Sequence, residues 1–360
     1  MNRIFVDCHG FDQGGQGTVT YIKNLYRPII SKNHDIDFYF GACNISAIEE
    51  IFGNEENVHY IKYATHNKYI RLLFVIPFIE IKYKLSYAHF QYYLPLINFC
   101  KTIVTIHDVL FLDYPQFFSK KYIRKNRFLF HLSSMIATCL LTVSEYSKNR
   151  IRHHFHPKKN IVVIPNCIDE TNNQINEVIK KEEFILFVSR IEKRKNHINL
   201  CKAFLNSSLK DKTNLYIVGR KDEGSNDFFK YIDVLPEEDK RKIKILDNVN
   251  DKELVRLYKQ AKLFVFPSFC EGFGIPPLEA LCYNVSTICA NNTGMSDYEF
   301  FGDRFFEAGN IVELQEKMEK YYDNSNGIDD IKRKMFEKYS IQNVSENFSN
   351  YITSLFKDRV

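Results

Sequence analysis

Two carboxylates flank a glycine-containing loop in the segment Phe264–Ala280. The apolar run before the loop is typical of a buried strand, and a helix is expected to begin at about Pro276, because proline is tolerated in the first helical turn. Backbone N–H groups and a helix N-terminus at the end of a strand can bind phosphate. Glu271 and Glu279 would repel a phosphate, so they suit the hydroxyl groups of a sugar and a ribose. A surface loop followed by a helix carboxylate explains these residues equally well.

A basic segment follows the predicted strand Ile185–Val188. Its four cations lie within six residues, at Arg190, Lys193, Arg194 and Lys195. Cations in this position can neutralise a diphosphate leaving group without a metal ion. For one such run taken alone, a solvated basic loop is the ordinary explanation.

A cluster of glycines occupies the first expected turn from strand to helix. It contains Gly14, Gly15 and Gly17, but Thr20 stands where a G-x-G-x-x-G dinucleotide fingerprint needs its last glycine. An ordinary tight turn explains this cluster by itself.

His107 follows the predicted strand of residues 102–106 directly, and Asp108 comes next. This position would direct His107 toward ligands that bind at the carboxyl ends of the strands. A single histidine in such a place is more often structural than functional, so this residue alone decides nothing.

Short apolar runs alternate with helical patterns along the whole chain, which indicates βαβ units and parallel sheets. The predicted strands are residues 4–8, 37–40, 58–61, 102–106, 140–143, 161–164, 185–188, 215–218, 243–246, 263–266 and 286–289. A polar linker, residues 169–183, divides them. We therefore predict two doubly wound, Rossmann-like α/β domains, residues 1–168 and 184–340, facing a central cleft.

Two further helices are well signalled. Residues 250–262 begin with a capping-box pattern, Asn250 followed by Glu253. Residues 341–356 carry apolar side chains at helical spacing and must bury that face on another part of the protein.

Composition excludes several classes of protein. The 360 residues are 45% hydrophobic and 26% charged, which excludes disordered and low-complexity chains. No run approaches the ~20 apolar residues of a membrane span, and residues 1–6 lead straight into a strand rather than a signal peptide. The nine scattered cysteines lack C-x-x-C spacing, so they indicate a reducing cytosol rather than disulfides or a zinc site.

The basic excess lies in the N-terminal half. Residues 1–165 carry 20 Lys/Arg and 12 Asp/Glu, whereas the remainder carries 29 and 32. The cations concentrate among aromatic residues at Lys120, Lys121, Arg124 and Lys125. A solvated helix face explains this patch, and the alternative is docking on an anionic surface such as a lipid headgroup or a lipid diphosphate. Nucleic acid is not expected, because no recognition motif accompanies the patch.

The sequence E-G-F-G-I-P-P-L-E-A, which begins at Glu271, resembles the Glu-seven-Glu motif of retaining GT-B glycosyltransferases, in the version of glycosyltransferase family 4. In that family the first Glu contacts the donor sugar and the second binds the ribose, which implies these roles for Glu271 and Glu279. The loop amides hold the sugar and the diphosphate, and here they belong to Phe273, Gly274 and Ile275.

Other segments resemble the same family in order and spacing. Arg190 and Lys195 match the Arg and Lys of its G-R-L-x-x-x-K pattern, which neutralise the donor diphosphate, although Ser189 replaces the usual glycine. The glycine turn is similar to the G-G-x-G loop that lies against the donor phosphate and the acceptor. This similarity implies donor contacts from Gly15 and Gly17, with Gly14 beside the acceptor.

The remaining matches place the chain near the mannosyltransferase-type members. The T-I-H-D sequence resembles theirs and implies that His107 lies beside the donor sugar, while Asp108 orients it or the acceptor. Gly219 and Arg220 match a further donor-side segment. The fit weakens at residues 291–298, where the family often has a Glu and this chain offers only Asp297.

The resemblance implies a retaining, metal-independent transfer of a hexose to a hydroxyl of a lipid-linked or polysaccharide acceptor. The departing diphosphate would accept the proton of the acceptor. Mannose from GDP-mannose is the donor we expect, with UDP-sugars left open, and the composition favours a bacterial surface polysaccharide such as an O-antigen. The expected location is cytoplasmic, with a peripheral place at the inner face of the plasma membrane left open. The C-terminal helix, residues 341–360, would return to the N-terminal domain.

Other functions remain to be weighed. A nucleotide-dependent oxidoreductase shares the architecture but would need the missing glycine fingerprint. A non-catalytic nucleotide- or carbohydrate-binding module would leave Glu271, Arg190 and Lys195 idle. A GT-B epimerase or phosphorylase is a closer alternative. Asp35 and Asp37 match the Asp-x-Asp signature of metal-dependent glycosyltransferases, but nothing around them supports it, so no cofactor or metal is expected.

Overall fold

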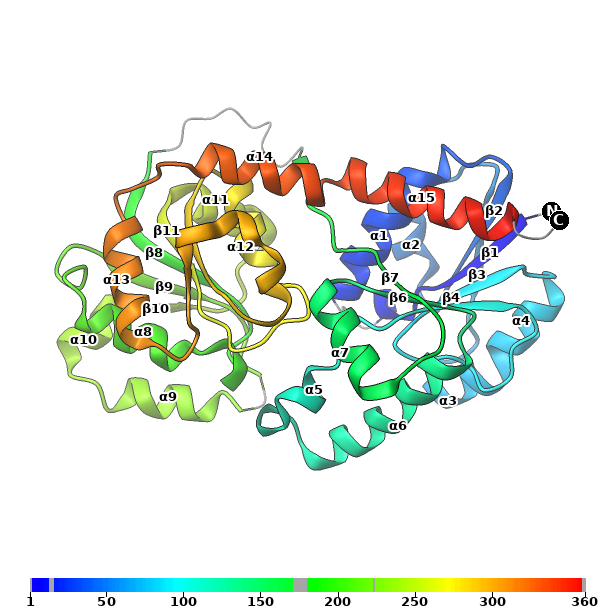
Figure 1. Ribbon diagram of the computed structural model, residues 1–360, viewed down its shortest axis with the longest axis horizontal. Coiled ribbons are helices and arrows are strands. Elements are labelled where there is room, and N and C mark those ends of the chain that lie inside the picture. Colours follow the sequence, from blue (N-terminus) through cyan, green and yellow to red (C-terminus); the bar gives the residue numbers. More distant parts are fainter. Residues whose placement is uncertain (1, 13–15, 171–179, 223, 358–360) are drawn as a thin grey trace. The chain divides into compact units, whose positions relative to one another are not determined.

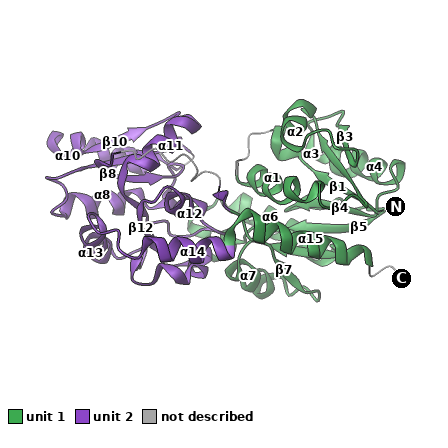
Figure 2. Cartoon of the chain, turned by 90° about the horizontal axis from the view of Figure 1, so that it is seen from above, with its two compact units in different colours: residues 1–167, 339–360 green, residues 168–338 purple. Residues whose placement is uncertain are grey.

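The computed structural model describes residues 2–12, 16–170, 180–222 and 224–357. Gly14 and Gly15 therefore lie outside the described residues. The chain forms two compact units, unit 1 with residues 1–167 and 339–360 and unit 2 with residues 168–338 (Figure 2). Each unit has its own sheet, with helices packed on both of its faces (Figure 1).

The sheet of unit 1 has seven parallel strands in the order β3-β2-β1-β4-β5-β6-β7. The strands are β1 (Asn2–Asp7), β2 (Ile36–Ala42), β3 (Val58–Lys62), β4 (Tyr87–Gln91), β5 (Lys101–Thr105), β6 (Cys139–Thr142) and β7 (Ile161–Val163). The order reverses direction at β1 and β4, and at such a switch point parallel sheets bind ligands. The strand β4 in the centre of this sheet was not among the predicted apolar runs.

The helices of unit 1 cover this sheet. They are α1 (Gln16–Ile30), α2 (Ile45–Phe52), α3 (Lys68–Ile70), α4 (Ile76–Lys82), α5 (Leu110–Asp113), α6 (Lys120–Ile136), α7 (Glu145–Phe155) and α15 (Ile341–Lys357). A π-helical turn, Arg71–Val75, joins α3 to α4 without a break. None of the described helices combines the length and the hydropathy that a bilayer span requires.

The helix α15 packs on α1 of unit 1, although the two helices lie at opposite ends of the chain (Figure 1). Its apolar stripe is buried, and the ring of Phe348 meets the ring of Tyr26 edge-on at 5.2 Å. Polar contacts fix its register, since Asn33 Nδ2 donates to Ser349 Oγ at 3.0 Å and Tyr87 Oη donates to the carbonyl of Leu355 at 2.8 Å. The amphipathic C-terminal segment thus buries its face on unit 1.

The sheet of unit 2 has six parallel strands in the order β10-β9-β8-β11-β12-β13. They are β8 (Glu182–Val188), β9 (Asn214–Val218), β10 (Ile243–Leu246), β11 (Ala261–Phe266), β12 (Ser286–Ala290) and β13 (Phe305–Phe306). The helices are α8 (His197–Asn206), α9 (Asn226–Asp233), α10 (Glu237–Lys242), α11 (Asp251–Gln260), α12 (Ile275–Cys282), α13 (Ile311–Tyr321) and α14 (Ile328–Tyr339). Because β8 and β11 are adjacent, the loops that follow them meet at one edge of the sheet.

Candidate functional site

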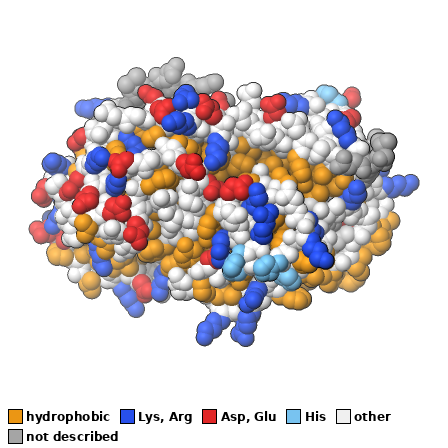
Figure 3. All heavy atoms as spheres, viewed as in Figure 1, with side chains coloured by type: hydrophobic (Ala, Val, Ile, Leu, Met, Phe, Trp, Pro, Cys, Tyr) orange, Lys and Arg blue, Asp and Glu red, His pale blue; other side chains and the backbone are white. Residues whose placement is uncertain are grey.

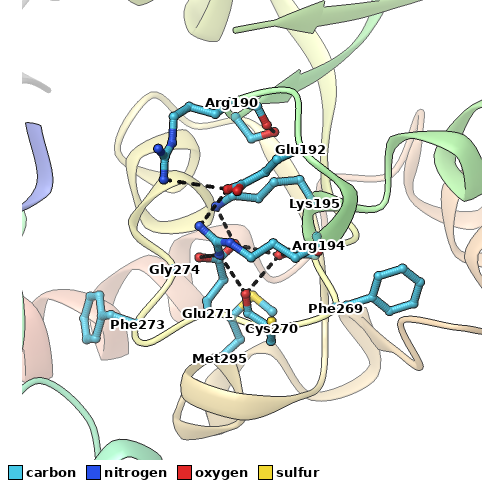
Figure 4. Close-up of polar contacts among 12 residues, drawn as sticks. Arg190, Glu192, Arg194, Lys195, Phe269, Cys270, Glu271, Phe273, Gly274 and Met295 are labelled. Carbon is cyan, nitrogen blue, oxygen red and sulfur yellow. Dashed lines mark hydrogen bonds and ion pairs between the residues drawn. The ribbon is translucent and has the colours of Figure 1, made fainter. Parts of the chain in front are cut away.

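The loops after β8 and β11 bring a carboxylate and two cations together (Figure 4). Glu271 is buried, and its Oε1 lies 2.6 Å from Lys195 Nζ. Its Oε2 lies 3.0 Å from Arg194 Nη1. The hydroxyl of Ser268 donates to Oε1 at 2.6 Å. Glu271 is thus held by hydrogen bonds and ion pairs from both loops, and two residues predicted to contact the donor touch each other.

The ionisation of this cluster follows from burial and charge. Burial alone would raise the pKa of Glu271, but Lys195 and Arg194 outweigh it and lower the pKa to about 2. Burial lowers the pKa of Lys195 by more than Glu271 raises it. A buried pair of this kind is stable only while both partners are present, because removing one leaves an uncompensated charge.

Arg190 lies at the exposed end of the cluster (Figure 4). Its Nη1 donates to Asp222 Oδ2 at 2.8 Å, and its Nη2 lies 3.7 Å from Glu192 Oε1. The side chain is 61% exposed. Exposed ion pairs contribute little to stability, so Arg190 can exchange its carboxylate partners for an incoming anion at low cost. Glu192 also pairs with Arg194, which links Arg190 to the Glu271 cluster.

The turn after β9 packs closely against the turn after β8. A Cβ atom added to Gly219 would lie 1.7 Å from the carbonyl oxygen of Ser189, so only glycine fits there. The N–H of Ile191 donates to the carbonyl of Arg220 at 2.8 Å. Arg220 itself is exposed. The predicted donor-side residues Gly219 and Arg220 therefore hold the backbone on both sides of Arg190.

The segment of residues 291–298 fixes the loop after β11, which sequence reasoning did not find. The Oγ1 of Thr293 accepts from the N–H of Glu271 at 2.9 Å, and Tyr298 Oη donates to the carbonyl of Phe273 at 2.8 Å. A Cβ atom on Gly294 would lie 2.3 Å from the carbonyl oxygen of Gly272. The doubtful position in this segment, Asp297, lies in a 3₁₀ turn. These side chains act on the loop backbone, which a sequence motif does not reveal.

Gly274 and Ile275 form the start of α12. Gly274 has φ +93°, a left-handed conformation that favours glycine, and a Cβ there would lie 2.8 Å from Met295 Cγ. Phe273 is buried with its ring edge-on to Tyr298 (5.5 Å), and Figure 4 shows it pointing away from Glu271. The first N–H groups of α12 have no partner within the helix, which is the geometry expected of an anion-binding loop.

Glu279 lies in the second turn of α12, where Tyr258 Oη donates to its Oε2 at 3.0 Å. Burial raises the pKa of this carboxyl. Its environment thus differs from that of Glu271, since no cation is paired with it among the described ion pairs. A hydroxyl ligand would suit it, and the ribose contact stays a prediction.

His107 lies after β5 of unit 1 and is buried. Its Nε2 forms a hydrogen bond of 2.6 Å with Gln91 Oε1, so this nitrogen carries the proton. Burial lowers the pKa of His107 to about 3, which keeps the ring neutral at physiological pH. The carboxylate of Asp108 accepts from the N–H of Leu110 at 3.1 Å.

Gly17, in the first turn of α1, is exposed.

A second buried histidine, His89, is linked to His107 through Gln91. His89 in β4 forms hydrogen bonds of 2.8 Å with Tyr26 Oη and with Thr105 Oγ1, and the amide of Gln91 lies 3.3 Å from its Nε2. Burial lowers the pKa of His89 to about 3. Gln91 thus joins the two imidazoles in one chain of hydrogen bonds, which no sequence motif predicts.

This chain predicts a pH dependence of stability. Both pKa values lie below the usual value of 6.5, so the unfolded state takes up protons that the folded state does not as the pH falls from 6.5 toward 3. Each histidine is expected to lower the free energy of unfolding by up to about 1.4 kcal/mol per pH unit in this range. The free energy of unfolding, measured with urea at several pH values, should fall less steeply with decreasing pH in His89→Gln than in the wild type. His34 is exposed, so His34→Gln should show the same pH dependence as the wild type. An unchanged pH dependence in His89→Gln would contradict the lowered pKa of His89.

Two further groups of polar side chains lie in unit 1, outside the loops after β8 and β11. The basic residues Lys120, Lys121, Arg124 and Lys125 are all exposed on α6. Asp12, Cys43 and His66 place one ligand atom each within 4.8 Å of one another and could hold a metal ion. Both oxygens of Asp12, however, already accept backbone N–H groups, from Cys43 at 3.0 Å and from Asn44 at 2.7 Å.

Comparison with known proteins covers both units. The family described as "Glycosyltransferase Family 4" matches residues 15–172, and the family described as "Glycosyl transferases group 1" matches residues 168–343. The O-antigen chain mannosyltransferase B of Escherichia coli is 25% identical over 79% of this chain and 80% of its own length. The O-antigen chain mannosyltransferase RfbU of Salmonella typhimurium is 33% identical over 52% of this chain and 51% of its own.

Solved structures share the fold at low identity. Sucrose-phosphate synthase from Thermosynechococcus elongatus matches with a TM-score of 0.77 and 14% identity over 99% of this chain and 100% of that one. Anabaena HepE in complex with UDP matches with a TM-score of 0.72 and 14% identity over 98% of this chain and 100% of that one. With the two family matches, the parallel sheets and the named relatives taken together, the chain belongs to the glycosyltransferases of family 4, with the GT-B fold.

Proposed function

We propose that this glycosyltransferase transfers mannose from GDP-mannose, with retention of configuration and without a metal ion, to a hydroxyl of a polysaccharide or lipid-linked glycan. The observation that carries the proposal is the cluster of Arg190, Arg194 and Lys195 around Glu271 at the ends of β8 and β11. The relatives named O-antigen mannosyltransferases support the choice of sugar and a role in bacterial surface polysaccharide synthesis.

In the proposed reaction, the bond between the anomeric carbon and the diphosphate breaks while a bond to the acceptor oxygen forms on the same face. The proton of the acceptor hydroxyl passes to an oxygen of the departing diphosphate. Arg190 and Lys195 stabilise the negative charge that develops there, which is the largest contribution a protein usually makes to such a step. Glu271, ionised and held by two cations, orients the hydroxyl groups of the sugar rather than attacking it.

The other residues have supporting roles in this proposal. Glu279 binds the ribose, and the amides of Phe273, Gly274 and Ile275 bind the sugar and the diphosphate. The neutral ring of His107 contacts a sugar hydroxyl, because a neutral imidazole can both donate and accept a hydrogen bond. Unit 1 receives the acceptor, for which Asp108 is a contact.

Nucleotide binding tests this proposal through Arg190. A ligand at 100 times its dissociation constant adds about 2.7 kcal/mol of stability, so GDP and GDP-mannose should raise the melting temperature, with or without EDTA. Arg190→Ala should weaken this binding by about 1.5–3 kcal/mol, the value of a hydrogen bond to a charged group. The matched control is Arg333→Ala, because Arg333 is 58% exposed and also pairs with two carboxylates.

Three outcomes would count against the proposal. A shift with UDP and UDP-sugars alone would contradict the GDP-mannose donor while keeping the enzyme class. Loss of the shift in EDTA would contradict metal independence. An equal shift in wild type and Arg190→Ala would remove Arg190 from the diphosphate site.

A further inference from the structure

The continuous helix of residues 68–82 in unit 1 exposes a stripe of large apolar side chains to solvent and buries two of its charged ones. The exposed side chains repeat at helical spacing: Tyr69, Ile70, Leu73, Phe74, Phe78 and Ile81. The opposite stripe buries Ile76, Pro77 and Ile79 together with Arg71 and Glu80. The helix is therefore apolar on both sides, whereas an ordinary surface helix has a polar outer face.

Specific contacts fix the helix in this orientation. Arg71 Nη2 lies 3.5 Å from Oδ2 of Asp7, which is buried at the end of β1. Glu80 Oε2 accepts from the N–H of Phe99 at 2.6 Å. Rotating the helix to bury its outer apolar stripe would break both contacts and expose Ile76 and Ile79 instead. The outward apolar stripe is therefore a built feature of the fold.

Neighbouring segments extend the apolar stripe into a wider surface. Three side chains of the loop after β4 are also exposed: Leu96, Ile97 and Phe99. The loop is tied to α6, since Tyr93 Oη donates to Asn126 Oδ1 at 2.6 Å, and α3 is tied to both because Lys68 Nζ lies 3.2 Å from the centre of the Tyr93 ring. We call these exposed side chains of residues 69–81 and 96–99 the apolar face. Figure 3 shows apolar side chains at the lower right margin, where Figure 1 places α3 and α4.

Cations border the apolar face. Lys82, Lys84 and Lys101 are exposed beside it, and Lys125 of α6 approaches the ring of Tyr69 to 5.9 Å. Residues 57–107 contain a single acidic side chain, the buried Glu80, and residues 120–136 contain none. A large exposed apolar surface with a border of one sign of charge marks an interaction site, and here the complementary partner is an anionic one.

We infer that unit 1 docks on an anionic phospholipid bilayer through the apolar face, with α6 laid on the headgroups. Phe74 and Phe78 enter the acyl region, while the lysines and arginines contact the lipid phosphates, the two contributions that hold an interfacial helix. A second copy of this chain is a poorer partner, because a symmetric contact would bring like charges together. This inference does not depend on the identity of the sugar donor, and binding to lipid measures it without any transfer reaction.

The absence of tryptophan from the sequence gives a direct test. Phe74→Trp introduces a single fluorophore into the apolar face, and Val312→Trp places one at an exposed apolar position of unit 2, in α13. Vesicles of equal parts phosphatidylcholine and phosphatidylglycerol should shift the emission of Phe74→Trp to the blue, and brominated acyl chains should quench it. The emission of Val312→Trp should not change. An unchanged emission of Phe74→Trp, or an equal change in both variants, would overturn the inference.

Sedimentation with the same vesicles separates the apolar from the charged contribution. Phe74→Ser with Phe78→Ser should bind about tenfold more weakly for each side chain removed, whereas Val234→Ser with Val312→Ser should bind like the wild type. Charge reversal at Lys120, Lys121 and Arg124 should weaken the dependence on phosphatidylglycerol and on salt. Equal binding to phosphatidylcholine alone would refute the anionic partner. A wild-type dimer that Phe74→Ser with Phe78→Ser converts to a monomer would show that a second copy covers the face.

Discussion

Glu271→Gln is expected to lower kcat for sugar transfer by about 10²–10³-fold, the usual cost of removing one preorganised electrostatic group from an active site. The same change removes the partner of two cations, because Lys195 Nζ and Arg194 Nη1 both contact this carboxylate. Lys195 would then be a buried charge without compensation, which typically costs 3–5 kcal/mol, so urea unfolding should show a loss of about that size. Transfer kinetics and unfolding together measure the two effects.

A second variant separates catalysis from folding. In Glu271→Gln with Lys195→Met, no unpaired buried charge is left at the Lys195 position, so most of the lost stability should return while the activity should not. Glu337→Gln is the control, since Glu337 forms an exposed ion pair with Arg333 and should change stability by less than about 1 kcal/mol. Activity in Glu271→Gln close to that of the wild type would refute a role for this carboxylate in transfer.

Gly219→Ala is expected to destabilise unit 2 by about 3 kcal/mol and to weaken nucleotide binding. The new methyl group would lie 1.7 Å from the carbonyl oxygen of Ser189. Side-chain rotation cannot relieve this clash, because the carbonyl belongs to the backbone and the methyl carbon is fixed to it. The two turns must separate, which moves the adjacent Arg190. Chemical unfolding and the GDP-induced rise in melting temperature would measure both effects.

The control for this variant is Gly309→Ala. A Cβ at Gly309 would meet no atom within 4 Å, so its stability should stay within about 0.5 kcal/mol of the wild type. Equal stability of the Gly219 and Gly309 variants would mean that the two turns can move apart without cost.

The sequence predicts those strands that are continuous apolar runs, because burial on both faces of a parallel sheet requires such a run. It does not reveal β4, although this strand lies in the centre of a sheet between β1 and β5. The reason is that β4 carries His89 and Gln91, whose polar atoms are buried and paired with Tyr26, Thr105 and His107. These partners come from distant parts of the chain, so only the folded structure explains the polar residues of the strand.

The candidate site likewise contains some residues that can be predicted from sequence and others that cannot. Glu271, Arg190 and Lys195 could be selected from sequence, since they stand in segments whose residue types and spacing suit a diphosphate. The contacts of Thr293 and Tyr298 with the loop after β11 could not be predicted from sequence, because they join side chains to backbone atoms of another segment.

The apolar face escaped prediction for a related reason. The most apolar short run of the chain, residues 72–79, gives no sign of which side is exposed, and the two nearest charges, Arg71 and Glu80, point inward. The rule that charged residues mark the solvent side of a helix fails here, because both charges have partners inside unit 1.

The contact between α15 and α1 also sets an order of events during synthesis. Asn33 and Ser349, which bond to each other, are 316 residues apart. At 5–20 residues per second, a ribosome needs roughly 15 to 60 s to travel from the first to the second. During that time the surface of α1 around Tyr26 is without its cover, while all of unit 2 emerges. Unit 1 therefore cannot complete its fold until α15 is synthesised, and unit 2 can finish folding first.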